Sequence, residues 1–449
     1  MSKVQLKPDV IAAIATPHGQ GGIGVVRLSG HDLSLLVQTL LGKVPVPRCA
    51  TYASFLDAQG QVLDQGIALF FPAPHSYTGE DILELQGHGG TAILQLVLQR
   101  CLEIGARLAQ PGEFTQRAFL NEKLDLAQAE SVADLIAATT SQAARSAMRS
   151  LQGEFSQAIH YLVGELVALR MLIEAMLDFP EEEIDALTIT QRDTRLVVLH
   201  AELEKILSLA QQGSLLREGA HIVLVGQPNV GKSSLLNRLS GEDAALVSEF
   251  PGTTRDLISR SIQIGGVPLH IIDTAGLRKA EDAVEQMGIA RTYEALKKAD
   301  AILILLDASY GMTEDDQKIL DELPSEIPRL YVFNKVDLLA QHAYVKEQDD
   351  ECHIYLSAKT GEGLELLRNE LLSLLGWHQE AGIFMARERH IYALLNARDH
   401  LQRAAGEINR PELCAEELRL AQEKLNSITG EFSADDLLGE IFSRFCIGK

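Results

Sequence analysis

Residues suited to binding a chain of phosphates form one continuous run, Gly226-Gln-Pro-Asn-Val-Gly-Lys232-Ser233, which matches the pattern GxxxxGK[ST]. The run follows the apolar residues Ile222–Val225 and precedes the helical pattern Ser234–Leu239, which is the context that the motif requires. In such a loop, backbone N–H groups and a helix N-terminus surround the phosphate oxygens. Lys232 would neutralise the β- and γ-phosphates, and the Ser233 hydroxyl would be a ligand of Mg²⁺.

A second run, Asn334-Lys335-Val336-Asp337, follows another apolar segment and predicts which base is bound. The Asp337 carboxylate can accept hydrogen bonds from the N1–H and N2–H₂ groups of guanine. Adenine has no such pair of donors and would leave the carboxylate unpaired, so the discrimination is large. Ser357-Ala358-Lys359 follows a further strand pattern, where a backbone N–H could meet guanine O6. Together with the phosphate motif, these residues predict a GTP site.

The remaining chemistry of a GTPase is expected between these two motifs. Asp273-Thr274-Ala275-Gly276 follows an apolar strand, so that Asp273 would stand behind the Mg²⁺ ligands and the Gly276 N–H would sense the γ-phosphate. A hydroxyl in the run Gly252–Asp256 could complete the coordination of Mg²⁺. The predicted GTP-binding residues are Asn229, Val230, Gly231, Lys232, Ser233, Ser234, Ser248, Glu249, Phe250, Pro251, Gly252, Thr253, Thr254, Asp273, Thr274, Ala275, Gly276, Asn334, Lys335, Asp337, Ser357, Ala358 and Lys359.

One position departs from Ras-like enzymes, because Leu277 stands where they carry a glutamine that orients the attacking water. An aliphatic side chain can neither orient water nor stabilise charge. The candidates for positioning water are the acidic residues Glu281, Asp282 and Glu285. Charge could be stabilised by an added monovalent cation, which the Asn229 side chain and backbone carbonyls of the loop 247–254 would bind through oxygen atoms.

Composition places these motifs in an acidic chain of several domains. The chain has 449 residues, 46% of them hydrophobic and 23% charged, and a formal net charge of −22. At roughly 150 residues per domain, this length predicts about three domains. The negative charge disfavours tight, non-specific binding to nucleic acid, although it permits a local basic patch. No apolar run reaches the ~20 residues that span a bilayer, no secretory signal is visible, and the five cysteines include no CxxC pair. We therefore expect a cytoplasmic protein with reduced thiols.

The elements that must position the motifs are short apolar strands separated by amphipathic helices. The expected strands are Ile222–Val225, Leu269–Ile272, Ala301–Leu306, Leu330–Phe333 and Ile354–Leu356. This pattern is typical of a mainly parallel sheet, and it predicts a Ras-like P-loop GTPase domain over residues 216–377.

Helical patterns flank this domain on both sides in the sequence. The expected helices are Leu124–Gln152, Phe155–Leu177, Gln191–Gln212, Arg387–Glu407, Glu412–Asn426 and Asp435–Phe445. The GTPase domain is thus predicted to interrupt one helical domain, whose halves are residues 121–215 and 378–449. The acidic run Glu181–Asp185 is interpreted as a solvated linker, with metal binding as the minor alternative.

Residues 1–120 have a different pattern of short strands broken by glycine, followed by one helix. The expected strands are Val10–Thr16, Gly24–Ser29, Gly66–Phe71 and Ile82–Gln86, and the helix is Gly90–Ile104. They predict a small α/β domain, so the whole chain is a multidomain α/β plus all-α protein. The run Gly19–Gly24 fits GxGxxG, but a β-branched run follows it where a dinucleotide site needs a helix, so a hairpin turn is favoured.

Two further features have competing interpretations. His88 has no partner at metal-binding spacing, and a turn or a hydrogen-bonded role is expected for it. A mild excess of arginine marks one C-terminal helical segment and would suit either a solvated face, which is favoured, or contact with the phosphates of an RNA. These arginines are Arg387, Arg389, Arg398, Arg403 and Arg410.

The motifs above, together with the N-terminal and C-terminal stretches, resemble the bacterial family of tRNA modification GTPases called MnmE or TrmE. The stretches that carry the resemblance outside the GTPase motifs are Ala15–Pro17, Gly21–Gly30, Ser76–Asp81, Gln86–Gly90, Pro111–Thr115 and Phe445–Lys449. The resemblance covers the whole chain. It implies a homodimer formed through the N-terminal domain, which would bind 5-formyl- or 5,10-methylenetetrahydrofolate.

The resemblance also implies a reaction and a partner. With the flavoprotein MnmG (GidA), in a heterotetramer or a larger complex, the family adds a carboxymethylaminomethyl group at C5 of the wobble uridine of certain tRNAs. The paired GTPase domains would associate in a K⁺-dependent way that activates hydrolysis.

The resemblance further assigns individual residues. The assignments are Asn229, Ser248, Phe250 and Thr253 for K⁺; Ser233 and Thr254 for Mg²⁺; Glu285 for orienting the attacking water beside the catalytic Lys232; Arg27, Glu84, Lys123 and Lys449 for the folate; and Cys446 for the cysteine of the C-terminal motif. By themselves, Arg27 and Glu84 indicate only a surface arginine and a strand residue, but a guanidinium, an ammonium and a carboxylate complement the carboxylate and the pterin edge of folate. Cys446 indicates a small buried apolar residue, and its role stays open.

Two other functions remain open from the sequence. A GTPase that assembles ribosomes would share Leu277 but would be expected to append an RNA-binding module. A folate-dependent one-carbon transferase with a regulatory GTPase domain would work without the flavoprotein.

Overall fold

The structure is a computed structural model in which residues 9–178, 186–242, 259–273, 296–339, 341–348, 351–378, 382–431, 435–443, 445 and 448 are described. Contacts divide the chain into two units. The first comprises Met1–Ala133, Ser150–Leu196 and Asp399–Lys449, and the second comprises Asp134–Arg149 and Val197–Arg398. Helices α7 (Ala186–Glu218) and α12 (Glu388–Gly406) each run from one unit into the other.

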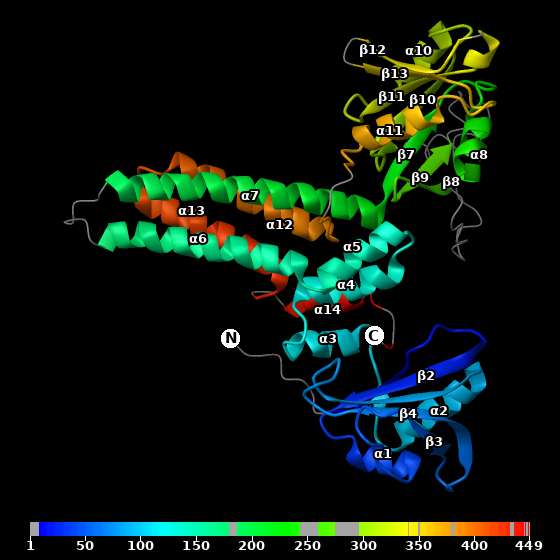
Figure 1. The fold of residues 1–449 in the computed structure, drawn as a ribbon, viewed down its shortest axis with the longest axis vertical. Coiled ribbons are helices and arrows are strands. Elements are labelled where there is room, and N and C mark those ends of the chain that lie inside the picture. Colours follow the sequence, from blue (N-terminus) through cyan, green and yellow to red (C-terminus); the bar gives the residue numbers. More distant parts are fainter. Residues whose placement is uncertain are drawn as a thin grey trace. The chain divides into compact units, whose positions relative to one another are not determined.

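A six-stranded sheet forms the N-terminal part of the first unit, with the strand order β3-β4-β5-β2-β1-β6 (Figure 1). The strands are β1 (Ile11–Ile14), β2 (Gly21–Gly30), β3 (Thr51–Leu56), β4 (Val62–Phe71), β5 (Asp81–Gly89) and β6 (Arg107–Leu108). All neighbours are antiparallel except β1 and β6.

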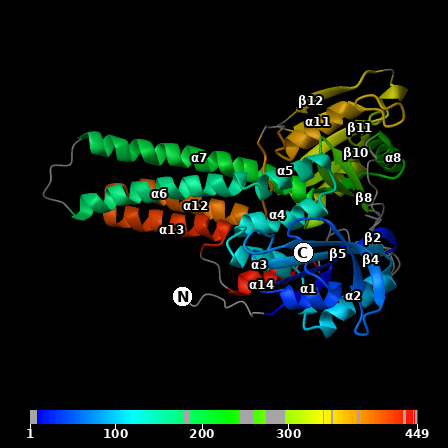
Figure 2. The ribbon, with the colours of Figure 1, turned by 60° about the horizontal axis from the view of Figure 1, so that its bottom comes forward.

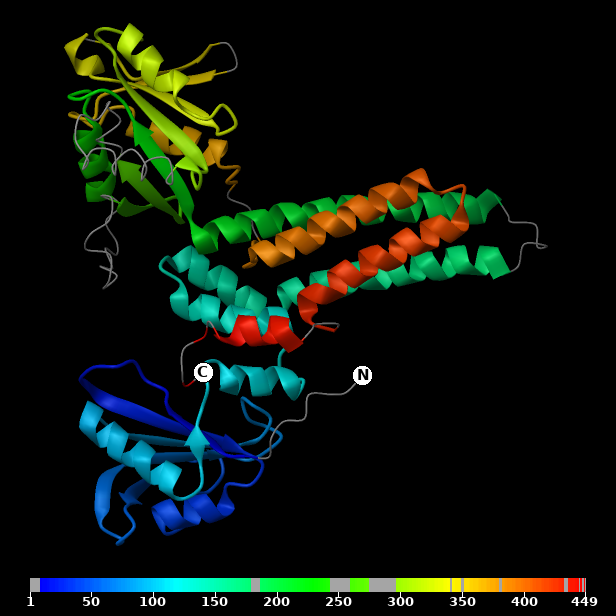
Figure 3. The same ribbon diagram turned by 180° about the vertical axis from the view of Figure 1, so that it is seen from behind.

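Helices cover both faces of this sheet, and each face has its own hydrophobic core. Helices α1 (Ser34–Leu41) and α2 (Thr91–Glu103) lie on one side (Figure 3), where they share a core with Ala12 and Val26. Helix α3 (Glu113–Leu120) covers part of the other face, where Phe114 packs with Ile11 and Ala13. Alternate strand residues point to opposite faces, which explains why Ala12 and its neighbours belong to different cores.

Two long antiparallel helices dominate the rest of the first unit. Helix α6 (Glu154–Asp178) lies side by side with α13 (Pro411–Thr429) (Figure 2). The Arg170 guanidinium on α6 donates to the Gln422 amide oxygen on α13 at 2.8 Å. Helix α14 (Asp435–Ser443) packs against α3 through Phe442. The acidic run Glu181–Asp185 lies outside the described residues.

The helix expected over Leu124–Gln152 is in fact two helices, α4 (Leu126–Ala137) and α5 (Ser141–Leu151). The side-chain hydroxyl of Thr140 accepts a hydrogen bond from the Ala143 N–H at 3.0 Å, which starts the second helix. The same hydroxyl donates to the Gly266 carbonyl in the turn between two strands of the second unit, at 3.0 Å. The prediction was wrong because the apolar periodicity continues across a capping residue.

The second unit contains a seven-stranded sheet with the order β12-β13-β11-β10-β7-β9-β8. The strands are β7 (Ala220–Val225), β8 (Ser259–Ile264), β9 (Val267–Asp273), β10 (Ala301–Asp307), β11 (Arg329–Asn334), β12 (Tyr344–Gln348) and β13 (Glu351–Leu356). The five inner strands are parallel, and the edge strands β8 and β12 are antiparallel to their neighbours. The carboxyl ends of the parallel strands therefore meet at one edge of the sheet.

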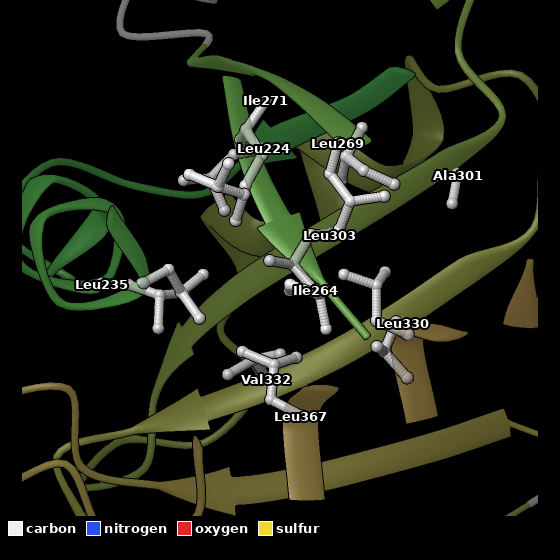
Figure 4. Close-up of a cluster of buried hydrophobic side chains, with 14 of the residues drawn as sticks. Leu224, Leu235, Ile264, Leu269, Ile271, Ala301, Leu303, Leu330, Val332 and Leu367 are labelled. Atoms are coloured by element: carbon white, nitrogen blue, oxygen red, sulfur yellow. The ribbon is translucent and has the colours of Figure 1, made fainter. Parts of the chain in front are cut away.

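Both faces of this sheet are buried, which accounts for its continuous apolar strands. On one face, Leu224 and Leu303 pack with Leu235 of α8 (Lys232–Glu242) and Leu367 of α11 (Leu364–Leu374) (Figure 4). On the other face, alternate strand residues pack with Leu320 of α10 (Glu314–Asp321). A 3-10 turn, η1 (Val336–Leu338), follows β11.

These elements confirm the predicted fold class of α/β domains combined with a helical domain. The domain boundaries predicted near residues 120, 215 and 377 remain predictions. Over the described ranges, no helix is long and apolar enough to cross a membrane.

Candidate functional site

The phosphate-binding loop connects the end of β7 to the start of α8, as the motif predicts. The Lys232 ammonium donates to the carbonyl oxygens of Gly226 at 2.6 Å and Gln227 at 2.9 Å, so it lies over the loop. Asn229 is exposed and has a φ of 64°, a left-handed conformation that is uncommon for a residue with a side chain. Ser233 is exposed in the first turn of α8, where its hydroxyl can reach a bound cation.

Asn334 joins the phosphate loop to the base-reading loops. Its side-chain amide donates to the Val230 carbonyl at 2.7 Å, and its side-chain oxygen accepts from the Ala358 N–H at 2.8 Å. Asn334 is 3% exposed, so both bonds are shielded from water. A Cβ atom at Gly231 would lie 2.3 Å from the Asn334 side-chain nitrogen, and the φ of Gly231 is 105°, so only glycine fits there.

The carboxylate predicted to recognise guanine is already oriented. The Ser357 hydroxyl donates to Asp337 Oδ1 at 2.7 Å. Ser357 is fully buried, and its hydroxyl also accepts from the Thr360 N–H at 3.2 Å. Because one oxygen of Asp337 is held by a protein donor, the other is free to face the guanine edge. Lys359 is exposed beside this loop, and its carbonyl accepts from the Arg238 guanidinium at 2.8 Å.

Asp273 ends β9 at the same edge of the sheet, where its backbone pairs with Leu224 of β7. This register places the backbone of Asp273 next to the start of the phosphate loop, and its role behind Mg²⁺ stays a prediction. The other predicted residues of the nucleotide site lie outside the described residues. They are Ser248, Glu249, Phe250, Pro251, Gly252, Thr253, Thr254, Thr274, Ala275, Gly276 and Glu285. Among the described residues, no cluster of three or more His, Cys, Asp or Glu side chains could hold a metal ion, whereas the predicted Mg²⁺ ligands are hydroxyl groups.

A second candidate site lies on the N-terminal sheet, where β2 and β5 pair Arg27 with Glu84. The Arg27 guanidinium donates to Glu84 Oε1 at 2.9 Å from Nε and lies 2.8 Å from it through a second nitrogen. The two side chains are 23% and 18% exposed. The Arg27 guanidinium also lies 5.8 Å from the centre of the Phe114 ring. The result is a partly open pair of opposite charges beside an aromatic side chain.

The C-terminal end of the chain reaches this pair. The Gly448 carbonyl accepts from the Arg27 guanidinium at 3.4 Å, and Gly448 packs against the backbone of Ile14 and Ala15. Lys449 and Cys446 lie outside the described residues. Lys123 is exposed and lies against Gly79, since a Cβ atom there would be 3.1 Å from Lys123 Cε. The structure thus brings Arg27, Glu84 and the C-terminal end together.

Tyr77 is a residue of this site that the sequence analysis did not single out. Its hydroxyl is 2.8 Å from the Thr115 hydroxyl of α3. Burial of the hydroxyl raises the pKa of Tyr77, while the Thr115 hydrogen bond and the nearby positive charge of Arg27 act in the opposite direction. The side chain keeps 36% exposure, so an aromatic surface is open to solvent close to Arg27. The only sequence signal was its place in the stretch Ser76–Asp81.

The structure describes three features that have competing interpretations in the sequence: a glycine run, a histidine and a group of arginines. Residues Gly19–Gly24 lead from β1 into β2, an antiparallel pair, so no helix follows the glycines. His88 Nδ1 is 2.7 Å from Asp64 Oδ1, which is a hydrogen-bonded role. Burial alone would raise the pKa of Asp64, but hydrogen bonds from His88 and Gln65 lower it below its ordinary value. In the C-terminal helices, the ion pairs Arg398–Glu204, Arg403–Glu417 and Arg410–Glu407 agree with a solvated face. The interpretation was wrong for Arg387, whose side chain is 13% exposed and donates to the buried Asp134.

The phosphate loop, the oriented Asp337 and the mainly parallel sheet define a P-loop GTPase, a hydrolase that acts on GTP. The family model for the MnmE helical domain matches residues 126–446, and the model for the GTP-binding protein TrmE N-terminus matches residues 10–123. The chain belongs to the MnmE (TrmE) family.

Relatives with this family name cover nearly the whole chain. The tRNA modification GTPase MnmE of Nitrosomonas europaea is 59% identical over 447 residues, which are 98% of this chain and 99% of the relative. The protein of the same name from Chromobacterium violaceum is 56% identical over 444 residues, with the same coverage of both chains. Among solved structures, this chain is similar to the G domain of the T. maritima FeoB iron transporter. The match covers 34% of this chain and 98% of that domain, with 25% sequence identity and a TM-score of 0.27.

Proposed function

We propose that this chain is a cytoplasmic tRNA modification GTPase that couples GTP hydrolysis to a one-carbon reaction on tRNA. The observation that carries the proposal is the 59% identity to a tRNA modification GTPase over 98% of the chain. The second support is the chemistry of the Arg27–Glu84 pair, which a simple GTPase does not need. The tRNA substrate, the homodimer and the flavoprotein MnmG follow from the family.

In the proposed hydrolysis, water attacks the γ-phosphate in line with the leaving oxygen. Lys232 and a Mg²⁺ ion held by Ser233 and Thr254 would neutralise the charge that develops on the phosphates. A K⁺ ion held by Asn229, Ser248, Phe250 and Thr253 would supply a further positive charge, and Glu285 would orient the water. The exposed, left-handed Asn229 in the phosphate loop supports the cation site, since its side-chain oxygen is open to a ligand.

In the proposed folate site, a carboxylate of the ligand would bind positive groups and the pterin edge would bind a carboxylate. Arg27, Lys123 and Lys449 supply the cations, and Glu84 supplies the carboxylate. The partial exposure of the Arg27–Glu84 pair supports this assignment, because a ligand can compete for both members. With MnmG as the partner enzyme, the one-carbon unit of 5-formyl- or 5,10-methylenetetrahydrofolate would then be transferred to C5 of the wobble uridine.

The experiment that tests this proposal is a calorimetric titration of 5-formyltetrahydrofolate into the purified full-length protein. Saturable binding that Arg27→Ala weakens would support the folate site and tRNA modification. The matched control is Arg419→Ala, because Arg419 forms an exposed pair with Glu416 on α13. Absence of binding by the folded protein would instead favour the ribosome-assembly alternative.

A further inference from the structure

Asp307 lies at the edge of the sheet where the base-reading motif begins, although no motif includes it. It is the last residue of β10 and is paired in register with Asn334 at the end of β11. The Ala308 N–H donates to the Asn334 carbonyl at 2.8 Å, so the loops that leave the two strands start side by side. Lys335 is the next residue after Asn334 and thus emerges beside Asp307.

The two side chains form a close ion pair. The Lys335 ammonium donates to Asp307 Oδ2 at 2.7 Å. The side chain of Asp307 is 14% exposed and that of Lys335 is 30% exposed. The other oxygen of Asp307 accepts from the Ser309 N–H at 2.9 Å, which fixes the carboxylate. Burial alone would raise the pKa of Asp307, but Lys335 and Ser309 lower it, so the carboxylate is ionised at neutral pH.

Lys335 needs such a partner because of its place in the loop. Its φ is 75°, a left-handed turn that directs the chain from β11 into η1. A lysine side chain has four flexible bonds and loses about 2 kcal/mol of rotamer freedom when it is fixed. A carboxylate that is itself held in place can fix the ammonium end and leave the apolar stem along the base pocket between Asn334 and Asp337.

The segment that starts at Asp307 is also attached to the phosphate loop. The Gln227 side-chain amide donates to the Thr313 hydroxyl at 2.8 Å. Thr313 begins α10 and exchanges hydrogen bonds with Asp316 in a capping box, which makes this attachment rigid. The segment 307–316 therefore contacts the base-reading loop at one end and the phosphate loop at the other.

We propose that Asp307 is a positioning residue of the guanine nucleotide site and acts by holding the Lys335 side chain in place for the base. It touches the nucleotide only through Lys335. The inference rests on the nucleotide site proposed above and adds a residue that determines how tightly guanine nucleotides bind.

A double-mutant cycle on the full-length protein tests this role, with GDP affinity measured by calorimetry. Asp307→Asn should weaken GDP binding about three- to fivefold, the range expected for losing a partly exposed ion pair. In a Lys335→Met background the same substitution should have no further effect, because the interaction is already absent. Asp307→Glu should recover part of the affinity. Asp321→Asn, which removes an exposed carboxylate from α10, should leave the affinity unchanged.

Two results would overturn the inference. One is an equal loss of affinity from Asp307→Asn with and without Lys335, and the other is no loss in the wild-type background. Thermal unfolding of each variant shows whether it is folded. If Asp307→Asn does not fold, Asp307→Ser, which also removes the carboxylate, carries the cycle, and unchanged GDP affinity of that variant together with a Lys335→Met defect would overturn the inference. Failure of the wild-type protein to bind GDP would refute the proposed nucleotide site itself, which is a distinguishable outcome.

Discussion

At the scale of single residues, we expect the choice of base to depend on Asp337. Its carboxylate is oriented by the Ser357 hydroxyl and presents acceptors where guanine has two donors. Replacing it with asparagine turns one acceptor into a donor, which suits the carbonyl at position 2 of xanthine and opposes the amino group of guanine.

We therefore expect Asp337→Asn to weaken GDP binding at least about a hundredfold, in the range that unpaired polar groups cost, and to improve binding of xanthosine diphosphate. Calorimetric titration of both nucleotides into the two proteins measures the change. Asp315→Asn is the control, because Asp315 is an exposed carboxylate on α10. Parallel losses for both nucleotides would mean that Asp337 supports the loop rather than reading the base.

The placement of two motifs could be predicted from local spacing. The phosphate loop and the Asn334–Asp337 run each consist of consecutive residues that follow a buried strand, and the structure brings them together. Tyr77 and Asp307 were not singled out, because each contacts a partner from a distant segment, Thr115 and Lys335 respectively. Asp307 did carry a signal, since a carboxylate directly after a buried parallel strand lies at the edge where the other motifs meet.

At the scale of elements, one carboxylate of α4 connects the segments that precede and follow the seven-stranded sheet (the P-loop sheet) in the sequence. Asp134 Oδ1 accepts from Arg217 Nε at 2.9 Å and from a terminal nitrogen of Arg387 at 2.8 Å. Arg217 lies in the last turn of α7, which leads into β7, and Arg387 immediately precedes α12. The side chain of Asp134 is only 6% exposed, so its removal would leave two guanidinium groups without this acceptor.

We expect Asp134→Ala to destabilise this unit by about 2–4 kcal/mol, below the full cost of breaking a buried pair because Arg217 is partly exposed. Trp377 is the single tryptophan and is buried in the core of the P-loop sheet, so its fluorescence follows urea unfolding of this unit. Asp315→Ala removes a 72% exposed carboxylate from α10 in the same unit and should cost less than about 1 kcal/mol. Equal shifts for the two variants would contradict the role of Asp134.

Elements were predicted well where a single hydrophobic periodicity runs through the whole element. They were predicted poorly where contacts with distant segments of the chain determine the element. The continuous apolar strands such as β10 were found, because both of their faces are buried. Strand β6 has two residues and exists by pairing with β1, which lies far away in the sequence. Helix α3 buries polar residues, including the 1% exposed Arg117, so its pattern does not show a buried face. The sequence likewise missed α1, β3, β8, β12, α10 and α11.

At the scale of the whole molecule, acid should act on a buried ionic network in the N-terminal part. Arg117 lies 2.9 Å from Glu80 and 3.0 Å from Glu113, and Arg107 pairs with both Glu113 and Asp9. Burial alone would raise the pKa of Glu113, but Arg107, the Gln110 N–H and Arg117 lower it below the ordinary value of 4.5. Burial alone would also raise the pKa of Asp9, but the hydrogen bonds and charges of Arg107 and Arg117 lower it below the ordinary value of 3.8.

The direction in which stability changes with pH follows from these lowered pKa values. A carboxyl whose pKa is lower in the folded state stabilises the fold fully above its ordinary pKa and loses that contribution as pH falls through the folded value. Stability should therefore decline below about pH 4.5 in the part that contains this network. Because the chain carries a net charge of −22, acid also relieves repulsion, so the wild-type profile alone mixes two effects.

One variant separates the loss of the ionic network from the relief of charge repulsion. Glu113→Gln should lower the thermal midpoint at neutral pH and lose less of it between about pH 6 and about pH 3 than the wild type. Circular dichroism at several pH values measures both slopes. Glu103→Gln, which removes a 47% exposed carboxylate, should keep the wild-type slope. A Glu113→Gln profile parallel to that of the wild type would show that the network does not govern acid stability.

The C-terminal segment contacts the N-terminal sheet at Arg27, and Gly112 lies where this segment approaches α3 most closely. Gly112 precedes α3 with a φ of 68°, and a Cβ atom there would lie 2.7 Å from the Phe442 carbonyl and 2.9 Å from Phe445 Cβ. These contacts hold α14 against α3, and the chain continues from Phe445 to Gly448, whose carbonyl meets Arg27. A methyl group at this position would push the C-terminal segment away although it touches no ligand.

Gly112→Ala should therefore weaken binding of 5-formyltetrahydrofolate by more than about fivefold and leave GTP hydrolysis unchanged, because the substitution touches none of the nucleotide motifs. Gly60→Ala is the matched control, since Gly60 also has a left-handed φ, 76°, but a Cβ atom there meets nothing within 4 Å. Both variants carry the backbone strain of a left-handed alanine, about 1–2 kcal/mol. Only the clash with the C-terminal segment differs, so an equal effect of the two variants on folate affinity would show that the position of that segment does not matter for the ligand.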